Sequence, residues 1–127
     1  MNYDEINEKL KELTTEDYIW LIYIGIIILS WYSNSLERKY FIYNDINCKN
    51  KYREIIIIIF SILLIIYLYF FKNSMKSIHE LKPTDNLKKR KLTELSAIGS
   101  LLIVISGIIF LYIAYTDTDI DVEIAFN

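Results

Sequence analysis

The sequence predicts an all-α integral membrane protein with three transmembrane helices, a short N-terminal amphipathic helix and an acidic C-terminal tail. The main observation is that three long uncharged blocks are separated by short, densely charged connectors. The blocks cover residues 18–36, 55–71 and 95–116, which are 19, 17 and 22 residues long. A helix needs about 20 residues to cross about 30 Å of hydrocarbon. Each block is therefore predicted to span a membrane.

The alternative is that these blocks are buried helices of a soluble core. Helices on a soluble core carry charged residues every three or four positions, and these blocks carry none. In residues 55–71, 14 of the 17 residues are Ile, Leu or Phe. Each of these favours insertion by roughly 0.3–0.6 kcal/mol at the centre of a span. The abundance of Ile and Lys matches A/T-rich codons, so it indicates a low-GC genome rather than special chemistry.

Residues 1–17 predict the short amphipathic helix. Its apolar side chains recur at three, four and three residues, on one stripe: Tyr3, Ile6, Leu10 and Leu13. Thr14, followed by Asp17, resembles a helix start. We expect this helix to lie on the membrane surface or on its neighbours. A coiled-coil or partner-binding helix is the alternative, although fewer than two heptads form a poor coiled coil. Its six acids are unlike a secretory signal, so span one should remain as an anchor.

The two connectors, residues 37–54 and 72–94, are predicted to hold the chain reversals. In the first, we expect helix extensions and a tight turn at Asn44 and Asp45. In the second, Pro83 should end the helix that leaves span two, because proline cannot continue a helix. Asp85 is then expected to cap the helix that enters span three.

The tail, residues 117–127, alternates acidic and apolar residues with the two-residue period of a half-buried strand. We expect a solvated terminus, with addition as a strand to a partner's sheet edge as the alternative. The tail lacks the sharp-turn glycine and the distant glutamate of an EF-hand loop, so the sequence does not predict a specific calcium site.

Lys and Arg set the expected orientation. The N-terminal segment has two, the first connector five, the second connector seven and the tail none. With three spans, the N-terminus and the second connector lie on one side of the membrane and together carry nine Lys and Arg residues. The first connector and the tail lie on the other side and carry five. The positive-inside rule therefore favours a cytoplasmic N-terminus and a non-cytoplasmic tail. Around span one alone, the first connector has five Lys and Arg residues against two in the N-terminal segment, which favours the reverse orientation. Around span three, the second connector has seven and the tail none, which favours a non-cytoplasmic tail.

Few residues could carry chemistry. The three blocks contain no ionisable side chain of the kind that moves protons or ions across a bilayer, so coupled transport is not expected. His79 and Cys48 are single and lie on connectors that the favoured topology places on opposite membrane faces. All three glycines lie inside spans, so no phosphate-binding loop exists. We therefore expect no enzymatic activity, no cofactor and no metal site.

Span three carries small residues at spacings of three, four and seven: Ser96, Gly99, Ser100, Ser106, Gly107 and Ala114. Small side chains let helix backbones approach closely, which is how helices associate in lipid. We predict that this stripe packs against spans one and two. Self-association, or docking onto another membrane protein, is the alternative.

Four basic residues precede span three: Lys88, Lys89, Arg90 and Lys91. Beside a membrane, such a run attracts anionic lipid headgroups by roughly 1 kcal/mol per residue, and it also serves as a topology signal. The net charge of −2, with no recognition module, argues against nucleic-acid binding.

These patterns favour a small multi-pass protein that acts by helix association as a structural, accessory or regulatory component. Its expected partners are the lipid bilayer and either a second copy or another membrane protein, contacted through span three. The alternative is a homo-oligomeric pore, viroporin-like or holin-like, lined by Ser100, Ser106 and Gly107. Against the pore, no span shows a continuous polar stripe.

Overall fold

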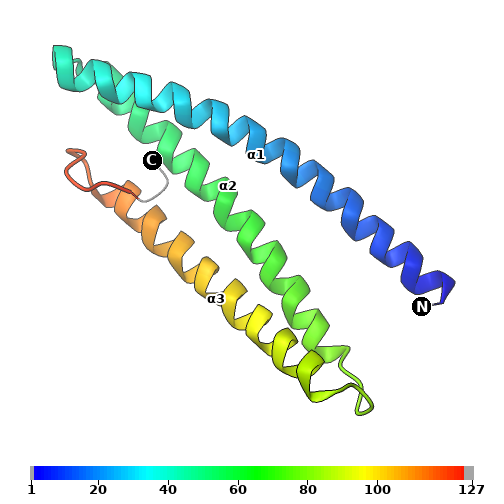
Figure 1. The fold of residues 1–127 in the computed structure, drawn as a ribbon. Helices are drawn as coiled ribbons and strands as arrows, with labels where there is room; N and C mark the ends of the chain where they lie inside the picture. Colours follow the sequence, from blue (N-terminus) through cyan, green and yellow to red (C-terminus); the bar gives the residue numbers. More distant parts are fainter. Residues whose placement is uncertain (1, 125–127) are drawn as a thin grey trace.

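The structure, a computed structural model, describes residues 2–124 and contains three long antiparallel helices within them (Figure 1). These are α1 (Tyr3–Tyr43), α2 (Ile46–His79) and α3 (Leu87–Thr116). Each is long and apolar enough to cross a membrane, judged by length and composition. The three predicted spans are confirmed as helices, and all three helices begin before their uncharged blocks.

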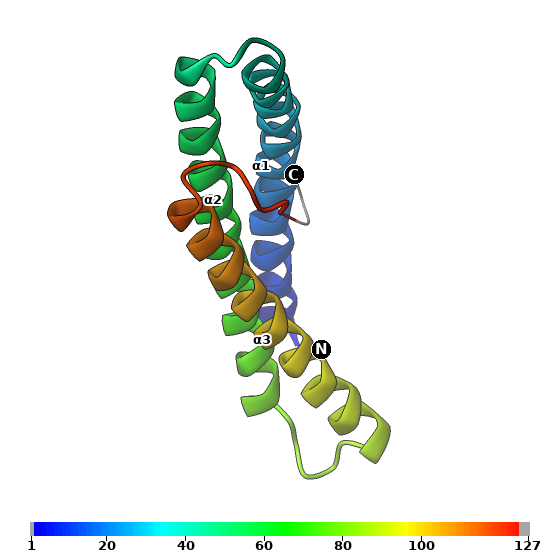
Figure 2. The same cartoon turned by 90° about the vertical axis from the view of Figure 1, so that its left-hand side faces the viewer.

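α2 is the central helix, and α1 and α3 pack on it without packing on each other. Within the described residues, no Cα atoms of α1 and α3 lie within 8 Å of each other. The buried core follows α2, where Ile56, Ile59 and Phe60 are almost fully enclosed. The Phe60 ring meets that of Phe110 on α3 at 5.8 Å between centroids. Figures 1 and 2 show α3 crossing α2 on the side that α1 leaves open.

α1 is one uninterrupted helix, and the separate start expected at Thr14 is not found. The helix begins at Asn2, whose side chain accepts a hydrogen bond from the Glu5 amide at 2.9 Å. The Thr14 and Thr15 hydroxyls instead donate to carbonyls four residues earlier, at 3.0 and 3.1 Å. Threonines bonded back in this way are helix-interior residues, so Thr14 does not cap a helix.

The N-terminal part of α1 turns its acidic side, not its apolar stripe, toward α2. Glu8 and Glu12 both form ion pairs with Lys76 of α2. The predicted apolar stripe faces away from the other helices, with its members between 43% and 77% exposed: Tyr3, Ile6, Leu10 and Leu13. The contact of this segment with α2 is therefore made by its acidic side and not by the predicted apolar stripe.

The first reversal occurs where the sequence predicts it. Asn44 ends α1 in the left-handed region, at φ 52° and ψ 39°. Asparagine adopts this conformation more easily than most residues. Asp45 begins α2, and its carboxylate accepts from the Asn47 and Cys48 amides at 3.0 and 3.3 Å. The expected turn at Asn44 and Asp45 is confirmed.

The second reversal differs from the prediction in its cap. α2 ends at His79, and Pro83 lies in the loop that follows. Asn86 caps α3, accepting from the Lys89 amide at 2.8 Å. Asp85 was expected in that role, but its carboxylate closes the loop by accepting from the Lys82 amide at 2.7 Å. The Lys82 amide and the Lys89 side chain hold the pKa of Asp85 below its usual range.

The described part of the tail, residues 117–124, folds back onto the helices through Ile124 and forms no strand. The Asp117 carboxylate accepts from the Asp121 and Val122 amides at 3.2 and 2.8 Å, which turns the chain. Ile124 is then buried, at 7% exposed, in the cluster around Tyr52. Most side chains of residues 117–124 are exposed, as expected for a solvated terminus, but Ile124 is not. The end of the predicted alternation, residues 125–127, lies outside the described residues.

Candidate functional site

One face of α3 packs against α2. Ala97, Val104, Gly107 and Ala114 are its buried residues. A Cβ at Gly107 would lie 3.1 Å from Cδ2 of Tyr67, which is closer than an ordinary contact. A side chain here fits only if the Tyr67 ring and the Leu64 side chain shift. The Ser100 hydroxyl also meets that of Ser74 on α2 at 2.8 Å.

The predicted small-residue stripe divides between two faces of α3. Ser100, Gly107 and Ala114 face α2, in agreement with internal packing. Gly99 has no atom within 4 Å of an added Cβ, and Ser106 is exposed. Gly99 and Ser106 are seven residues apart, or two helical turns, so they share one stripe. The sixth member, Ser96, borders the pockets described below. Span three packs on span two but not on span one.

Two of the buried α3 residues, Ala97 and Val104, are not among the residues that the sequence singles out. Both are apolar residues in a helix that is apolar on all sides, so no hydrophobic period marks the face they occupy. At about 100° per residue, the six small residues spread over about 120° of the helix circumference. The contact with α2 takes only one side of this sector.

Only part of the basic run is available for contacts at the surface. Arg90 donates from Nη2 to the Lys82 carbonyl at 3.0 Å, so it holds the loop. Lys89 pairs with Asp85 at 3.2 Å. Lys88 and Lys91 are exposed, and no ion pair is formed by either within the described residues.

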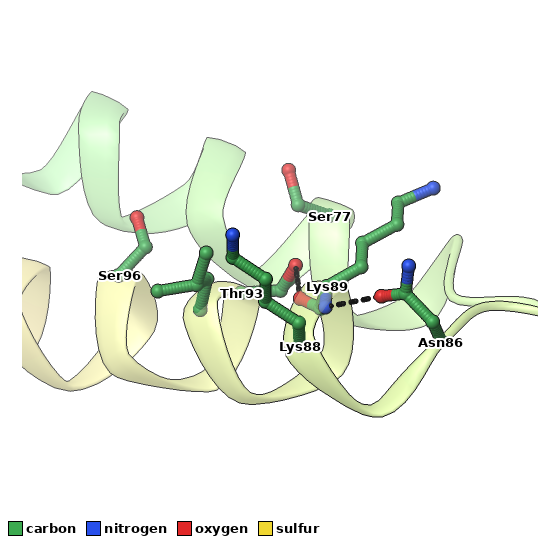
Figure 3. Close-up of a pocket in the computed structure, with 7 residues that line it drawn as sticks. Ser77, Asn86, Lys88, Lys89, Thr93 and Ser96 are labelled. Atoms are coloured by element: carbon green, nitrogen blue, oxygen red, sulfur yellow. Dashed lines mark hydrogen bonds between the residues drawn. The ribbon is translucent and has the colours of Figure 1, made fainter.

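Lys88 and Lys89 line a pocket of about 470 Å³ between the end of α2 and the first turns of α3. Figure 3 shows this basic pocket, with Ser77 contributed by α2 and Ser96 by α3. The Asn86 side chain also lines the pocket while it caps α3. The basic pocket thus combines two cationic side chains with several hydrogen-bonding groups.

A second cavity, also of about 470 Å³, adjoins the basic pocket and shares Ser77 and Ser96 with it. This acidic cavity brings Glu12 and Glu16 of α1 to the gap between α2 and α3. Glu12 lies 3.5 Å from Lys76, whereas Glu16 has no ion pair among the described residues. Sequence reasoning missed Glu12 and Glu16 because only the packing of α1 places them beside α3.

The opposite end of the bundle is held by polar contacts of the tail. Lys49 Nζ lies 3.1 Å from Asp119 Oδ1, and Arg53 donates from Nη2 to the Tyr115 carbonyl at 3.2 Å. The Val122 amide, together with the other amides that Asp117 accepts from, lowers the pKa of Asp117. In the part of the chain that the structure describes, no group of three His, Cys, Asp or Glu side chains is placed to hold a metal ion.

The single histidine and the single cysteine are far apart. Cys48 lies at the start of α2 and His79 at its end, 31 positions or about 46 Å along one helix. They therefore form no dyad. Desolvation, and then Asp45, raise the pKa of the Cys48 thiol, which disfavours the reactive thiolate.

Comparison with known proteins identifies no relative. The chain matches no family model, and no curated protein or solved structure is significantly similar to it.

Proposed function

We propose that the chain is an integral membrane protein that acts as a structural, accessory or regulatory component by helix association through α3. The observation that carries this proposal is the unequal use of the two faces of α3. The face with Gly107 and Ser100 is occupied by α2. The face with Gly99 and Ser106 contacts no other helix in the described residues.

Small residues on an unoccupied face suit association in lipid, where the hydrophobic effect provides no drive between helices. Close backbone approach, with the dispersion contacts and weak hydrogen bonds that it allows, supplies the energy instead. A glycine and a serine seven residues apart permit such an approach over two turns. The partner is another membrane protein or a second copy of this chain.

The orientation that we propose has a cytoplasmic N-terminus and a non-cytoplasmic tail. It rests on the nine Lys and Arg residues of the N-terminal segment and the second connector, against five on the other side. The ion pair of Lys49 with Asp119 supports the common side of the first connector and the tail. Labelling of Cys48 and of a cysteine placed at Thr118 should report the same membrane face; labelling on opposite faces contradicts three spans.

The alternative function, a homo-oligomeric pore, receives less support from the arrangement of its expected lining. Ser100 and Gly107 are turned toward α2, whereas Ser106 is exposed. The three residues therefore do not form one surface that water could line.

The test is co-purification of partners with the Gly99→Ile variant from the native membrane. Gly25→Ile is the matched control, because an added Cβ at Gly25 also has no atom within 4 Å. We expect Gly99→Ile to lose its partner while it still inserts, and Gly25→Ile to keep it. Retention of the partner by Gly99→Ile would refute association through this face.

A further inference from the structure

The basic pocket and the acidic cavity adjoin each other between the helices, and the two together form the polar trough. Ser77 of α2 and Ser96 of α3 line both. Lys88 and Lys89 lie on the side of the α2–α3 loop, and Glu12 and Glu16 lie on the side of α1. The adjoining spaces thus carry cationic side chains at one end and anionic side chains at the other.

The trough lies at the depth of lipid headgroups, if the chain inserts as proposed above. Glu16 is two positions before the first uncharged block, Ser77 six positions after the second, and Ser96 one position after the start of the third. All three therefore lie near one boundary between hydrocarbon and water. At that boundary, the polar trough meets phospholipid headgroups from the surrounding bilayer.

The deeper wall of the acidic cavity is aromatic and aliphatic. Tyr23 of α1, Tyr67 and Phe70 of α2, and Ile103 of α3 line it. These residues belong to the uncharged blocks, so this end of the acidic cavity lies on the side of the hydrocarbon layer. An occupant with a polar head and an apolar chain fits the change from charged to apolar lining.

The charges of the trough are incompletely neutralised by the protein. Glu16 and Lys88 have no ion pair within residues 2–124. Glu12 shares Lys76 with Glu8. A half-buried carboxylate such as Glu16 is stabilised when a cation reaches it, and Lys88 is stabilised by an anion. A ligand that carries both charges satisfies both ends.

We propose that the polar trough binds a zwitterionic phospholipid with a primary ammonium headgroup, of the phosphatidylethanolamine type. The phosphate accepts hydrogen bonds from Lys88 and the shared serines. The ammonium donates to the carboxylates of Glu12 and Glu16, and an acyl chain follows the aromatic wall. A primary ammonium has three N–H donors for these acceptors, whereas a quaternary choline group has none.

The test is native mass spectrometry of the detergent-purified full chain, titrated separately with phosphatidylethanolamine, phosphatidylcholine and phosphatidylglycerol. We expect phosphatidylethanolamine to bind about tenfold more tightly than either of the others, because only it satisfies both ends of the trough. Equal binding of phosphatidylcholine would overturn the role of the primary ammonium. Equal binding of phosphatidylglycerol would show that only the basic run attracts lipid, and would also overturn the proposal.

Two variants locate the site. Glu16→Gln and Lys88→Ala should each reduce phosphatidylethanolamine affinity by about tenfold, since each removes one charge-assisted contact. The matched controls are Asp17→Asn and Lys72→Ala, which change exposed charges outside the trough. Unchanged binding in Glu16→Gln, with helix content preserved by circular dichroism, contradicts the site.

The experiments distinguish a failure of the lipid-binding proposal from a failure of the proposed function. If alkaline carbonate extracts the chain from membranes, both proposals fail together. If the chain is inserted but shows no lipid preference, only the trough proposal fails. If Gly99→Ile keeps its partner while the lipid preference persists, only helix association through α3 fails.

Discussion

At the residue scale, two glycines of one helix have opposite surroundings. A Cβ at Gly107 would approach Tyr67 Cδ2 at 3.1 Å and Leu64 Cδ1 at 3.3 Å, whereas one at Gly99 meets nothing within 4 Å. The difference comes from the α2 side chains that lie opposite Gly107. The same residue type therefore serves internal packing at one position and an unoccupied surface at the other.

Gly107→Ile should lower the free energy of unfolding by about 1–3 kcal/mol, because a side chain here pushes α3 away from α2. Gly99→Ile should change it by less than about 0.5 kcal/mol, as expected for an open position. Thermal unfolding of the two variants in detergent, followed by circular dichroism, measures both. Equal losses would contradict the assigned faces of α3.

Docking of the tail should depend on pH, because the Asp117 carboxylate accepts hydrogen bonds from the Asp121 and Val122 amides. These amides favour the ionised carboxylate and so lower the pKa of Asp117. A lowered pKa contributes stability above the ordinary aspartate value of about 4, and that stability is lost as the pH falls through the folded pKa. We expect the tail to stay docked near neutral pH and to loosen below about pH 4.

The measurement for the tail is amide hydrogen exchange of Val122 by nuclear magnetic resonance as the pH is lowered, corrected for the intrinsic pH dependence of exchange. Asp117→Asn should remove most of the protection at neutral pH. Asp121→Asn is the control, because within the described residues only the backbone amide of Asp121, and not its side chain, is bonded to Asp117. Protection that is insensitive to both pH and Asp117→Asn would refute this role.

At the scale of elements, the helix ends are set by short polar side chains in the connectors. Asn86 rather than its neighbour Asp85 caps α3, because the Asp85 carboxylate is already bonded to the Lys82 amide. Both residues suit a cap equally by type. The path of the loop after Pro83 decides between them.

Asn86→Ala should destabilise the protein by about 1 kcal/mol through loss of the bond to the Lys89 amide. Thr84→Ala is the matched control in the same loop, since Thr84 is exposed. Thermal unfolding in detergent compares the two. If the two variants unfold at the same temperature, Asn86 is not the cap that holds α3.

At the scale of the whole molecule, α2 carries the fold and leaves α1 and α3 apart. The apolar core follows α2, and the ion pairs of Lys76 join α2 to the N-terminal part of α1. Since α1 and α3 do not meet, the space between them retains the polar trough. An arrangement with α1 packed on α3 would bury Glu12 and Glu16 without a cation for Glu16.

The α2–α3 register can be tested by cross-linking. In a Cys48→Ser background, Ser74→Cys with Ser100→Cys should form a disulfide, because the native hydroxyls lie 2.8 Å apart. Ser74→Cys with Ser106→Cys should not form one within a single chain, since Ser106 lies on the exposed side of α3. Mass spectrometry of monomer bands reports each product. A link to position 106 would refute the register.

The sequence by itself determined the three helices and the turn at Asn44 and Asp45. The length of an uncharged block and the turn preference of Asn are local properties, so they are visible without a structure. The candidate stripe on α3 was recovered in part, with Gly107 and Ser100 at the internal contact. The open space beside Gly99, in contrast to the close contacts at Gly107, could not be derived, because α3 is apolar on every side.

Only the tertiary structure decided which faces meet and what they enclose. It turned the acids of α1 toward Lys76, divided the α3 stripe, and docked Ile124 of the tail against the helices. Each of these outcomes depends on side chains from segments far apart in the chain. Hydrophobicity fixes how long a helix is, but complementary shape and charge between helices fix how it is rotated.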